Sequence, residues 1–159
     1  CKAVKDFSDL QFMIKVHPAE LSFSIYKRIT KDVGVNALIT RDANIYEVLY
    51  ICDIVITGFS ATALDAMILD KPVITVNFTG LEDPLPFAES GAAIGVYKEK
   101  DLAEAIKRGL YDEVAREKLR KAREKFVYEH SYKKDGKATE RIVKLMEQMV
   151  EDSAKGRCS

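Results

Sequence analysis

The sequence of 159 residues has no tryptophan, only three cysteines and no formal net charge. Cys1, Cys52 and Cys158 are scattered, with neither a C-x-x-C pair nor a histidine at metal-ligand spacing. This pattern argues against a disulfide framework and a zinc site, and it favours a reducing compartment. We expect Cys52, which lies beside an apolar run, to be a small buried side chain.

Long apolar runs are also missing. No stretch of about 18 apolar residues is present, and no signal peptide is visible. The balanced charge gives no reason to expect nucleic-acid binding. Because 47% of the residues are apolar, a chain of this length can form a single core. Since the sequence does not begin with methionine, we expect residues 1–159 to be one domain excised from a longer protein.

Several motifs of catalysis and phosphate binding are absent. The phosphate loops GxGxxG and GxxxxGK[ST] do not occur, and neither does the hydrolase motif GxSxG. No carboxylate cluster has metal-ligand spacing. We therefore expect no metal, and the sequence assigns no catalytic residue.

Short β-branched runs alternate with segments of helical periodicity. Expected strands cover residues 12–16, 36–40, 53–57, 73–76 and 91–96, and expected helices cover residues 20–33, 44–51, 63–70, 101–110, 113–130 and 137–153. This alternation predicts an α/β fold with a doubly wound parallel sheet and extra C-terminal helices. Ligands bind such sheets outside the carboxyl ends of the strands. We expect residues 155–159 to be a disordered tail.

The stretch at residues 43–79 organises the rest of the chain. It contains a strand, a glycine turn, a helix and a second strand, which is a βαβ crossover. A helix that begins directly after a buried strand points its free N–H groups at the carboxyl edge of the sheet, where they suit a phosphate. Gly58 would keep side-chain bulk away, and hydroxyls would add donors. The candidate phosphate-binding residues are Gly58, Ser60, Ala61, Thr62 and Ala63.

Asp65 falls in the first turns of the same helix and would reach a ribose hydroxyl, as an acidic residue does in dinucleotide folds. Structural explanations stay open for all of these residues. Gly58 can serve only as a tight turn, Ser60 only as a cap, and Asp65 only as a complement to the helix dipole.

Other candidates follow neighbouring strands. Pro18 keeps His17 out of helical geometry at the end of its strand, where the imidazole would donate to a phosphate oxygen or bond to backbone. Arg41 would stand beside a diphosphate, or form a cap and a surface ion pair with Asp42. The loop at residues 77–83 lies at the same edge, whereas His130 is expected on the surface.

The C-terminal third is helical. The charge run at residues 113–125 is expected to be a solvated helix face with paired charges. Its basic residues would alternatively face an anionic membrane, although acidic residues interleave them. The last helix carries an apolar stripe formed by Ile142, Val143, Leu145, Met146, Met149 and Val150.

The order of these features resembles a known family. The central motif is CDIVITGFSATALDAMILDKPVITVN, which follows KVHPAE and precedes ESGAAIGVYKEKDLAEAIKRGL. Over nearly the whole chain it resembles the C-terminal, nucleotide-binding half of GT-B-fold glycosyltransferases, in the CDP-glycerol glycerophosphotransferase and surface-polysaccharide branch. The resemblance implies two Rossmann-like halves with the active site between them. It also implies that His17 contacts the phosphates of the donor and that Gly91 lets backbone approach the ligand, unless Gly91 is only a turn glycine.

The function that the resemblance implies is donor binding in a glycosyl- or glycerophosphotransferase that builds cell-surface polymers. The substrate would be a nucleotide-diphospho-sugar or a CDP-polyol, with no separate cofactor, and the partner would be the N-terminal acceptor domain of the same enzyme. We expect a cytoplasmic location, peripheral to the inner membrane face through the full-length protein, and no activity from residues 1–159 alone. Two alternatives stay open: half of a UDP-N-acetylglucosamine 2-epimerase-like enzyme, and a free-standing nucleotide-binding module without catalysis.

Overall fold

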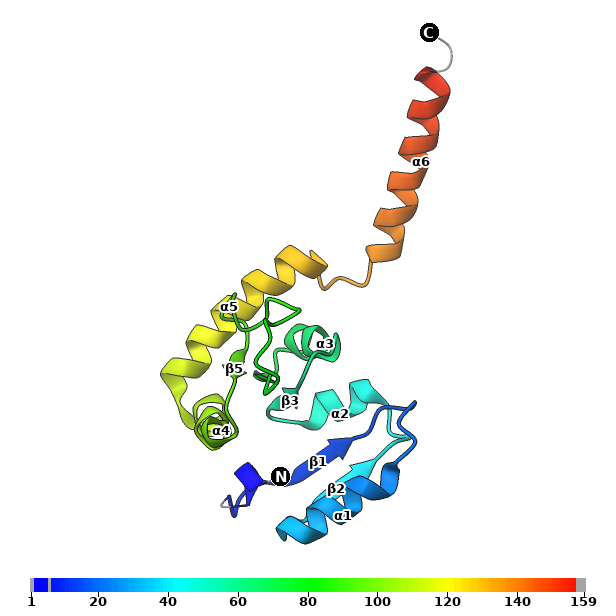
Figure 1. Cartoon of the computed structure of the whole chain (residues 1–159). Coiled ribbons are helices and arrows are strands. Elements are labelled where there is room, and N and C mark those ends of the chain that lie inside the picture. Colours follow the sequence, from blue (N-terminus) through cyan, green and yellow to red (C-terminus); the bar gives the residue numbers. More distant parts are fainter. Residues whose placement is uncertain (1, 6, 157–159) are drawn as a thin grey trace.

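The computed structural model describes residues 2–5 and 7–156 (Figure 1). In chain order the elements are η1 (Lys2–Val4), β1 (Phe12–Lys15), α1 (Phe23–Val33), β2 (Ala37–Thr40), α2 (Ile45–Ile51), β3 (Val55–Thr57), α3 (Thr62–Ile68), β4 (Val73–Val76), β5 (Ile94–Val96), η2 (Glu99–Asp101), α4 (Leu102–Tyr111), α5 (Glu113–Ser131) and α6 (Ala138–Gly156). The predicted parallel α/β fold is confirmed.

The strands pair in two small parallel sheets rather than in one continuous sheet. The first has the order β1-β2, with Ile14 opposite Ile39, and the second has the order β3-β4-β5, with Ile74 between Ile56 and Ile94. Figure 1 shows β1, β2 and α1 as a separate layer, with α2 between this layer and the three-stranded sheet.

Both faces of the three-stranded sheet are covered. Successive side chains of a strand point to opposite faces. Accordingly, Val73 packs with Ala66 and Met67 of α3, whereas Ile74 packs with Ile106 of α4. The doubly wound arrangement therefore holds for β3, β4 and β5, and it leaves the carboxyl edge of this sheet to the loops.

The expected helix at residues 20–33 begins later, at Phe23. The N–H of Glu20 donates to the carbonyl of His17, and the N–H of Ser22 donates to Oε1 of Glu20. These local bonds form a turn in place of the first helical turn, since acidic and hydroxyl side chains can satisfy backbone groups outside a helix.

The charge run on α5 is mostly solvated, with one exception. Arg123 is only 4% exposed, and its Nη2 donates to the carboxylate and to the carbonyl of Asp70, at 2.7 and 3.3 Å. Arg123 lies one turn from Leu119 and one turn from Phe126 and Val127, which all face the core. Arg123 lies on the inner face of an amphipathic helix, and its charge is paired there with Asp70, so the expectation of a fully solvated charge run is wrong at Arg123.

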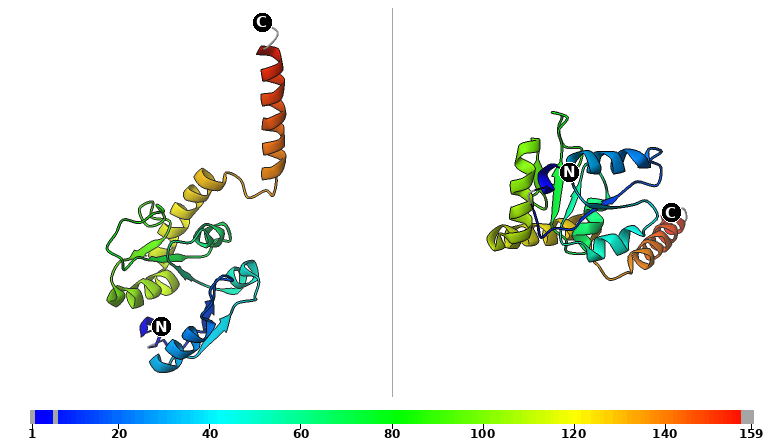
Figure 2. Two further views of the ribbon diagram at one scale, coloured as in Figure 1. Left: turned by 45° about the vertical axis from the view of Figure 1, so that its right-hand side comes forward. Right: turned by 90° about the horizontal axis from the view of Figure 1, so that it is seen from below.

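Helix α6 projects away from the rest of the molecule (Figures 1 and 2). It continues to Gly156, beyond the expected end near residue 153. The remainder of the expected tail, residues 157–159, lies outside the described residues, as do Cys1 and, within that tail, Cys158. The apolar stripe of α6 is solvent-exposed, because no other element in the described part of the chain lies beside this helix.

Candidate functional site

The turn between β3 and α3 is closed by its own hydroxyls. The hydroxyl of Ser60 donates to Oγ1 of Thr62 at 2.9 Å, and it accepts the N–H of Thr62 at 3.2 Å. Helix α3 begins at Thr62, after Ala61. Ser60 therefore satisfies one of the N–H groups that a helix start leaves open, as a capping residue does.

These bonds decide which donors remain for a ligand. The N–H of Ala63 donates to the carbonyl of Ser60, so neither Ala63 nor Thr62 has a free N–H. This corrects the expectation that every N–H of the turn is open. The N–H groups of Ser60 and Ala61 have no partner among the described residues. Because the Thr62 oxygen accepts from Ser60, the Thr62 proton is available to a ligand.

Gly58 has no structural need to be glycine. Its φ is not positive, and a Cβ built there would meet nothing closer than the carbonyl oxygen of Val76 at 3.9 Å. The backbone would accept alanine at this place without strain or collision. The fold alone therefore does not require glycine at position 58.

Asp65 lies on the first turns of α3 and is half-buried. Its carboxylate has no hydrogen bond or ion pair within the described part of the chain, so both oxygens can accept from a ligand hydroxyl. Helix α3 has only seven residues. The hydroxyl of Thr62 and the free N–H groups of the turn, rather than a long helix, are thus the donors that the turn offers.

His17 is exposed at the carboxyl end of β1. Its Nδ1 accepts the N–H of Ala19 at 3.1 Å, so the proton of the neutral ring resides on Nε2. The backbone bond that we considered as the structural alternative is therefore present, and Nε2 is still free to donate. His17 belongs to the two-stranded sheet and residues 58–63 to the three-stranded sheet, and no hydrogen bond of the described residues joins them.

Arg41 is held by backbone and by an aromatic ring. Its Nη2 donates to the carbonyl of Glu20 at 2.7 Å, and its guanidinium lies 5.2 Å from the ring centre of Phe23. The considered ion pair with Asp42 does not form, and the cap of α2 is Asn44, whose Oδ1 accepts the N–H of Tyr46. Arg41 is therefore engaged in joining the start of α1 to the end of β2.

Gly91 has a φ of 73°, which favours glycine, and its N–H donates to the carbonyl of Ala88. This geometry supports the turn explanation for Gly91.

His130 is exposed, as expected, and its ring stacks on Phe126 with centres 3.9 Å apart.

A network that the sequence did not reveal lies after β4. Asn77 is 4% exposed, and its amide nitrogen donates to the carbonyl of Leu81 and to the carboxylate of Asp83. Its amide oxygen accepts the N–H and the hydroxyl of Thr79. The other oxygen of Asp83 accepts the Tyr97 hydroxyl at 2.7 Å, a bond that raises the pKa of Tyr97.

This network fixes the loop that follows β4 to the end of β5. Buried polar groups in proteins are nearly always hydrogen-bonded, and all bonding groups of the Asn77 side chain are used. The available signal was an asparagine directly after the buried strand PVITV, with an aspartate six residues later.

One comparison with known proteins decides the family. A family model described as CDP-glycerol:poly(glycerophosphate) glycerophosphotransferase matches residues 4–148. The chain belongs to this family. The match supports a glycerophosphotransferase-type role in cell-surface polymer synthesis. No curated protein matches the chain.

Two further findings concern this glycerophosphotransferase-family chain. Among residues 2–5 and 7–156, no group of three histidine, cysteine or acidic side chains is placed to hold a metal ion, and no helix is apolar over enough length to cross a membrane. Cys52 is half-buried rather than fully buried, its thiol donates to the carbonyl of Leu49, and burial raises its pKa.

Proposed function

We propose that this domain binds CDP-glycerol and holds its diphosphate at the turn between β3 and α3. The observation that carries the proposal is the family match over residues 4–148, because the name of the family specifies a CDP-linked donor. The turn supports the proposal, because its N–H and hydroxyl groups without a partner lie at the carboxyl end of β3. Parallel sheets bind their ligands at this end of the strands.

The donors have a direct chemical use in this transfer. An acceptor hydroxyl oxygen would attack the phosphorus that carries glycerol, and the bond from that phosphorus to the oxygen bridging it to CMP would break. CMP would leave with the electron pair, and the hydroxyl proton would pass to a base. Fixed donors near the bridging phosphates would stabilise the charge that develops on CMP.

Each candidate residue receives one role. The Thr62 hydroxyl and the N–H groups of Ser60 and Ala61 would donate to phosphate oxygens, and Gly58 would let the diphosphate approach the turn. The Asp65 carboxylate would accept from ribose hydroxyls. His17 would donate from Nε2 to a phosphate oxygen, which requires the ligand to reach both sheets.

The acceptor and the base would belong to a second, N-terminal domain of the same enzyme. Such an enzyme would work at the cytoplasmic face of the membrane, and CDP-glycerol would be its substrate, with no separate cofactor. Positioning of two reactants accounts for roughly 7 to 11 kcal/mol of a barrier, so we expect the 159-residue chain alone to bind donor without turnover.

A competition between nucleotides tests the proposal. The chain is titrated by calorimetry with CDP-glycerol, CDP, UDP, ADP, GDP and UDP-N-acetylglucosamine. We expect saturable binding that is tightest for the cytidine compounds. Preference for UDP-N-acetylglucosamine would favour an epimerase-like enzyme, and absence of binding at millimolar concentration of every ligand would refute a donor site on this domain.

A further inference from the structure

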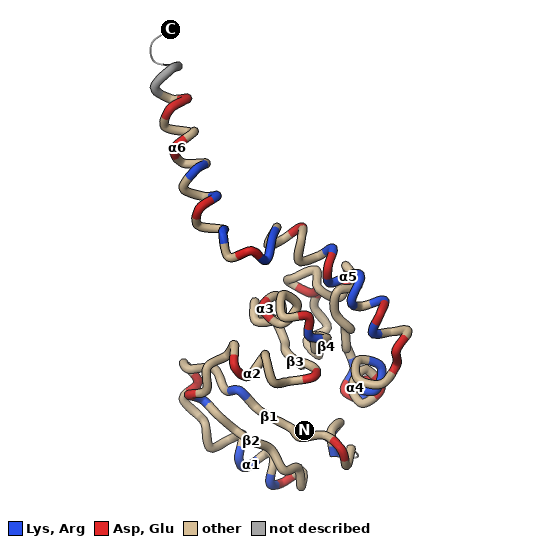
Figure 3. Tube along the Cα trace, turned by 180° about the vertical axis from the view of Figure 1, so that it is seen from behind, with Lys and Arg blue, Asp and Glu red and all other residues tan. Residues whose placement is uncertain are grey.

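Two strands of the molecule each have an edge without a partner. Within the described part of the chain, β1 pairs only with β2, and β3 pairs only with β4. Figures 1 and 3, seen from opposite sides, show β1 nearer than β2 to the three-stranded sheet. The free edge of β1 is therefore turned toward the free edge of β3, and we call the place between these two edges the inter-sheet gap.

Backbone groups of β1 point into the inter-sheet gap. The N–H of Val16 donates to the carbonyl of Thr40, which ends β2. Because successive residues of a parallel strand bond to opposite sides, the N–H and C=O groups of Met13 and Lys15 point away from β2. They have no hydrogen-bond partner among residues 2–5 and 7–156.

Strand β3 repeats this arrangement. The N–H of Val55 donates to the carbonyl of Pro72, just before β4, so the N–H and C=O groups of Ile56 point into the gap and have no partner among the described residues. All three residues of β3 are half-buried, whereas residues 73–75 of β4 are buried. Backbone groups enclosed by a core are nearly always hydrogen-bonded. The free edge of β3 therefore lacks a neighbour that its position in the core requires.

Neither edge is protected against pairing. Natural edge strands are usually blocked by proline, bulges or outward charges. Strand β3 has no charged residue, and Lys15 is the one charged residue of β1 (Figure 3). The ammonium of Lys15 is bound to the carbonyls of Val16 and Arg41, at 3.0 and 2.8 Å, so it is held beside the end of β2. Both edges can therefore accept a strand.

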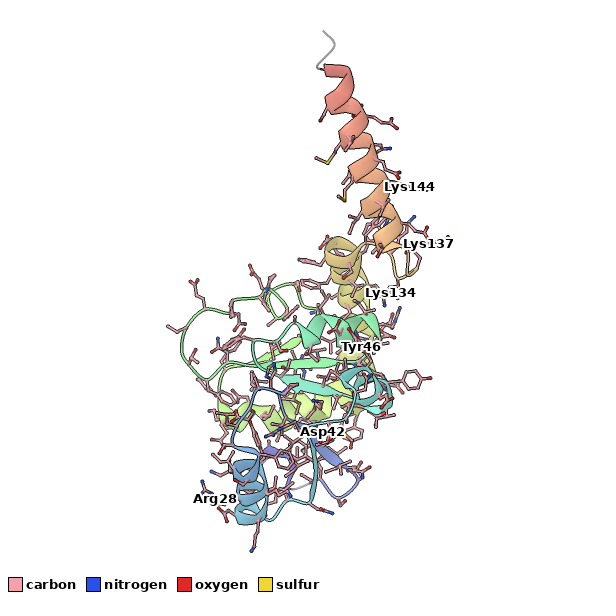
Figure 4. The ribbon with its side chains drawn as sticks, turned by 90° about the vertical axis from the view of Figure 1, so that its right-hand side faces the viewer. Arg28, Asp42, Tyr46, Lys134, Lys137 and Lys144 are labelled. Carbon is pink, nitrogen blue, oxygen red and sulfur yellow. The ribbon has the colours of Figure 1, made fainter. Side chains whose placement is uncertain are left out.

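Chain order leaves one place in the inter-sheet gap. From β1 the chain proceeds to β2, and from β3 to β4 and β5, away from the gap on either side. Figure 4 shows Asp42 and Tyr46 on the connection between the two sheets, which continues as α2; a helix bonds its backbone internally and pairs with neither edge. Doubly wound sheets with this reversal have the strand order 3-2-1-4-5-6. Strands β2, β1, β3, β4 and β5 match every place except that of the first strand.

The N-terminal segment, residues 2–5 and 7–10, lies where the connection from such a strand would run. The right-hand view of Figure 2 shows this segment between α4 and α1. A right-handed crossover into β1 passes over the face that α1 covers, because both connections advance in the same direction across the sheet. The apolar side chains that pack the segment against the core beside α4 are Ala3, Val4, Phe7 and Leu10.

We propose that one further strand, parallel to β1 and β3, lies between them and joins the two sheets, and that residues preceding residue 1 supply it. The proposal shares with the proposed function the premise of a longer enzyme. A crossover takes about 10 to 12 residues, and residues 2–11 supply most of it, so roughly 20 preceding residues suffice for the rest of the crossover and a strand. The remainder of an N-terminal domain does not fit this place, because only an extended segment offers N–H and C=O groups to both edges. A second copy would pair with one edge and leave the other open.

Hydrogen exchange without nucleotide tests the strand. The 159-residue chain is compared with a chain lengthened by its own preceding residues, roughly 20 in number, and with the full-length enzyme. We expect the N–H groups of Met13, Lys15 and Ile56 to exchange at least about tenfold more slowly in both longer chains, and that of Val55, which is already bonded, to change much less. Equal rates in all three chains would overturn the proposal.

Two other outcomes of the same experiment would also refute it. Protection that is confined to the full-length enzyme would assign the edges to a more distant part of that enzyme. Protection that rises with the concentration of the 159-residue chain would assign them to a second copy.

Proline substitutions provide a second readout. Met13→Pro removes an N–H that points into the gap, whereas the control Ile14→Pro removes one that faces β2. Proline is tolerated on a free edge and not inside a sheet. Met13→Pro should therefore lower the melting temperature less than Ile14→Pro in the 159-residue chain, and at least as much in the lengthened chain. The same difference between the two variants at both lengths would contradict an inserted strand.

The strand has a consequence for the donor site, which rests on the proposed function. It would place His17 and the turn at residues 58–63 on one edge of one sheet, after strands about 9.6 Å apart. CDP should then bind the lengthened chain at least about tenfold more tightly than the 159-residue chain, and His17→Ala should remove this gain. Slow exchange without any gain in CDP affinity would support the strand and count against the donor site instead.

Discussion

The two sheets of this molecule differ sharply in how they are packed. The three-stranded sheet holds fully buried side chains on both faces, among them Val73, Ile74 and Val96. Within residues 12–40, which form β1, α1 and β2 and are all described, Val16 is the one fully buried apolar side chain. The same strand–helix–strand pattern therefore yields a dense core in one case and a half-covered layer in the other.

The difference in packing shows which part of the molecule can hold a binding site for the donor substrate rigidly. Residues 58–63 and the Asn77 network extend from the strands of the dense sheet, whereas His17 and Arg41 extend from the half-covered sheet. A site that must hold a diphosphate in a fixed geometry gains most from the dense side. The loosely packed sheet leaves Ile25, Ile29 and Leu38 exposed on its outer layer.

The largest expected effect comes from truncating the dense core. Ile74 is 0% exposed, and Ile74→Ala should lower the free energy of unfolding by about 2 to 5 kcal/mol, through lost burial and a residual cavity. Leu38 is 53% exposed, and Leu38→Ala should cost less than about 1 kcal/mol. Urea denaturation followed by far-UV circular dichroism measures both. Equal losses would show that the two sheets are packed alike.

A smaller effect is expected at the ion pair that joins the end of α3 to α5. Asp70→Ala removes the acceptor of the buried Arg123 and places alanine at a φ of 57°, so it should cost about 1.5 to 3 kcal/mol. Asp70→Gly loses the same charge, but glycine adopts this positive φ without strain, so the variant should be less destabilising than Asp70→Ala. If urea denaturation shows glycine to be the more costly, backbone strain plays no part here.

A third effect concerns the loop fixed by Asn77. Tyr97→Phe removes the hydroxyl that donates to Asp83 and should cost about 0.5 to 1.5 kcal/mol, near the lower limit because Tyr97 is exposed. Amide hydrogen exchange in residues 78–86 should accelerate more than exchange in β4. Uniform exchange rates throughout the variant would mean that the hydroxyl does not hold the loop.

The smallest effect is confined to the exposed face of α5. Hydrogen bonds from Arg120 lower the pKa of Glu117 from 4.5 to about 2. Because the pKa of this carboxyl group is lower in the folded chain than in the unfolded chain, its ionisation stabilises the fold. This stabilisation is complete above the unfolded-state pKa of 4.5 and is lost as the pH falls through about 2. Carboxyl-carbon NMR should show the Glu117 midpoint near 2, and Arg120→Gln should raise it toward its ordinary value. An unchanged midpoint in Arg120→Gln would exclude Arg120 as the cause.

Local patterns in the sequence predicted most elements of the fold. Residues 73–76 and 113–130 match β4 and α5 closely, because burial periodicity decides both. Division of the strands into two sheets was not predictable, since pairing between β1 and β3 depends on contacts distant in sequence. The stripe on α6 predicted an amphipathic helix but not its exposure, because periodicity does not say what covers a face.

The candidate site was predictable in its location and less so in its bonds. The glycine turn before α3 was found from the strand–turn–helix pattern. The bond from Ser60 to Thr62, which leaves one hydroxyl proton free, depends on side-chain rotamers. The bond from Arg41 to the Glu20 carbonyl joins residues 21 positions apart, and the burial of Arg123 depends on which face α5 turns inward. A sequence pattern contains none of these facts.

The central claim is that the turn before α3 binds a diphosphate, and a pair of affinities tests it most directly. Calorimetry measures CDP and cytidine binding to the wild type, Thr62→Val, Ser60→Ala and Asp65→Asn, and thermal unfolding measures the stability of each. We predict that Thr62→Val weakens CDP binding by about 1.5 to 3 kcal/mol without affecting cytidine, because it removes the free hydroxyl donor. Ser60→Ala should act in the same direction but less, and Asp65→Asn should weaken both ligands alike. If Thr62→Val and Ser60→Ala lower the melting temperature while the ratio of the two affinities stays at the wild-type value, the turn is only a helix cap and the account is contradicted.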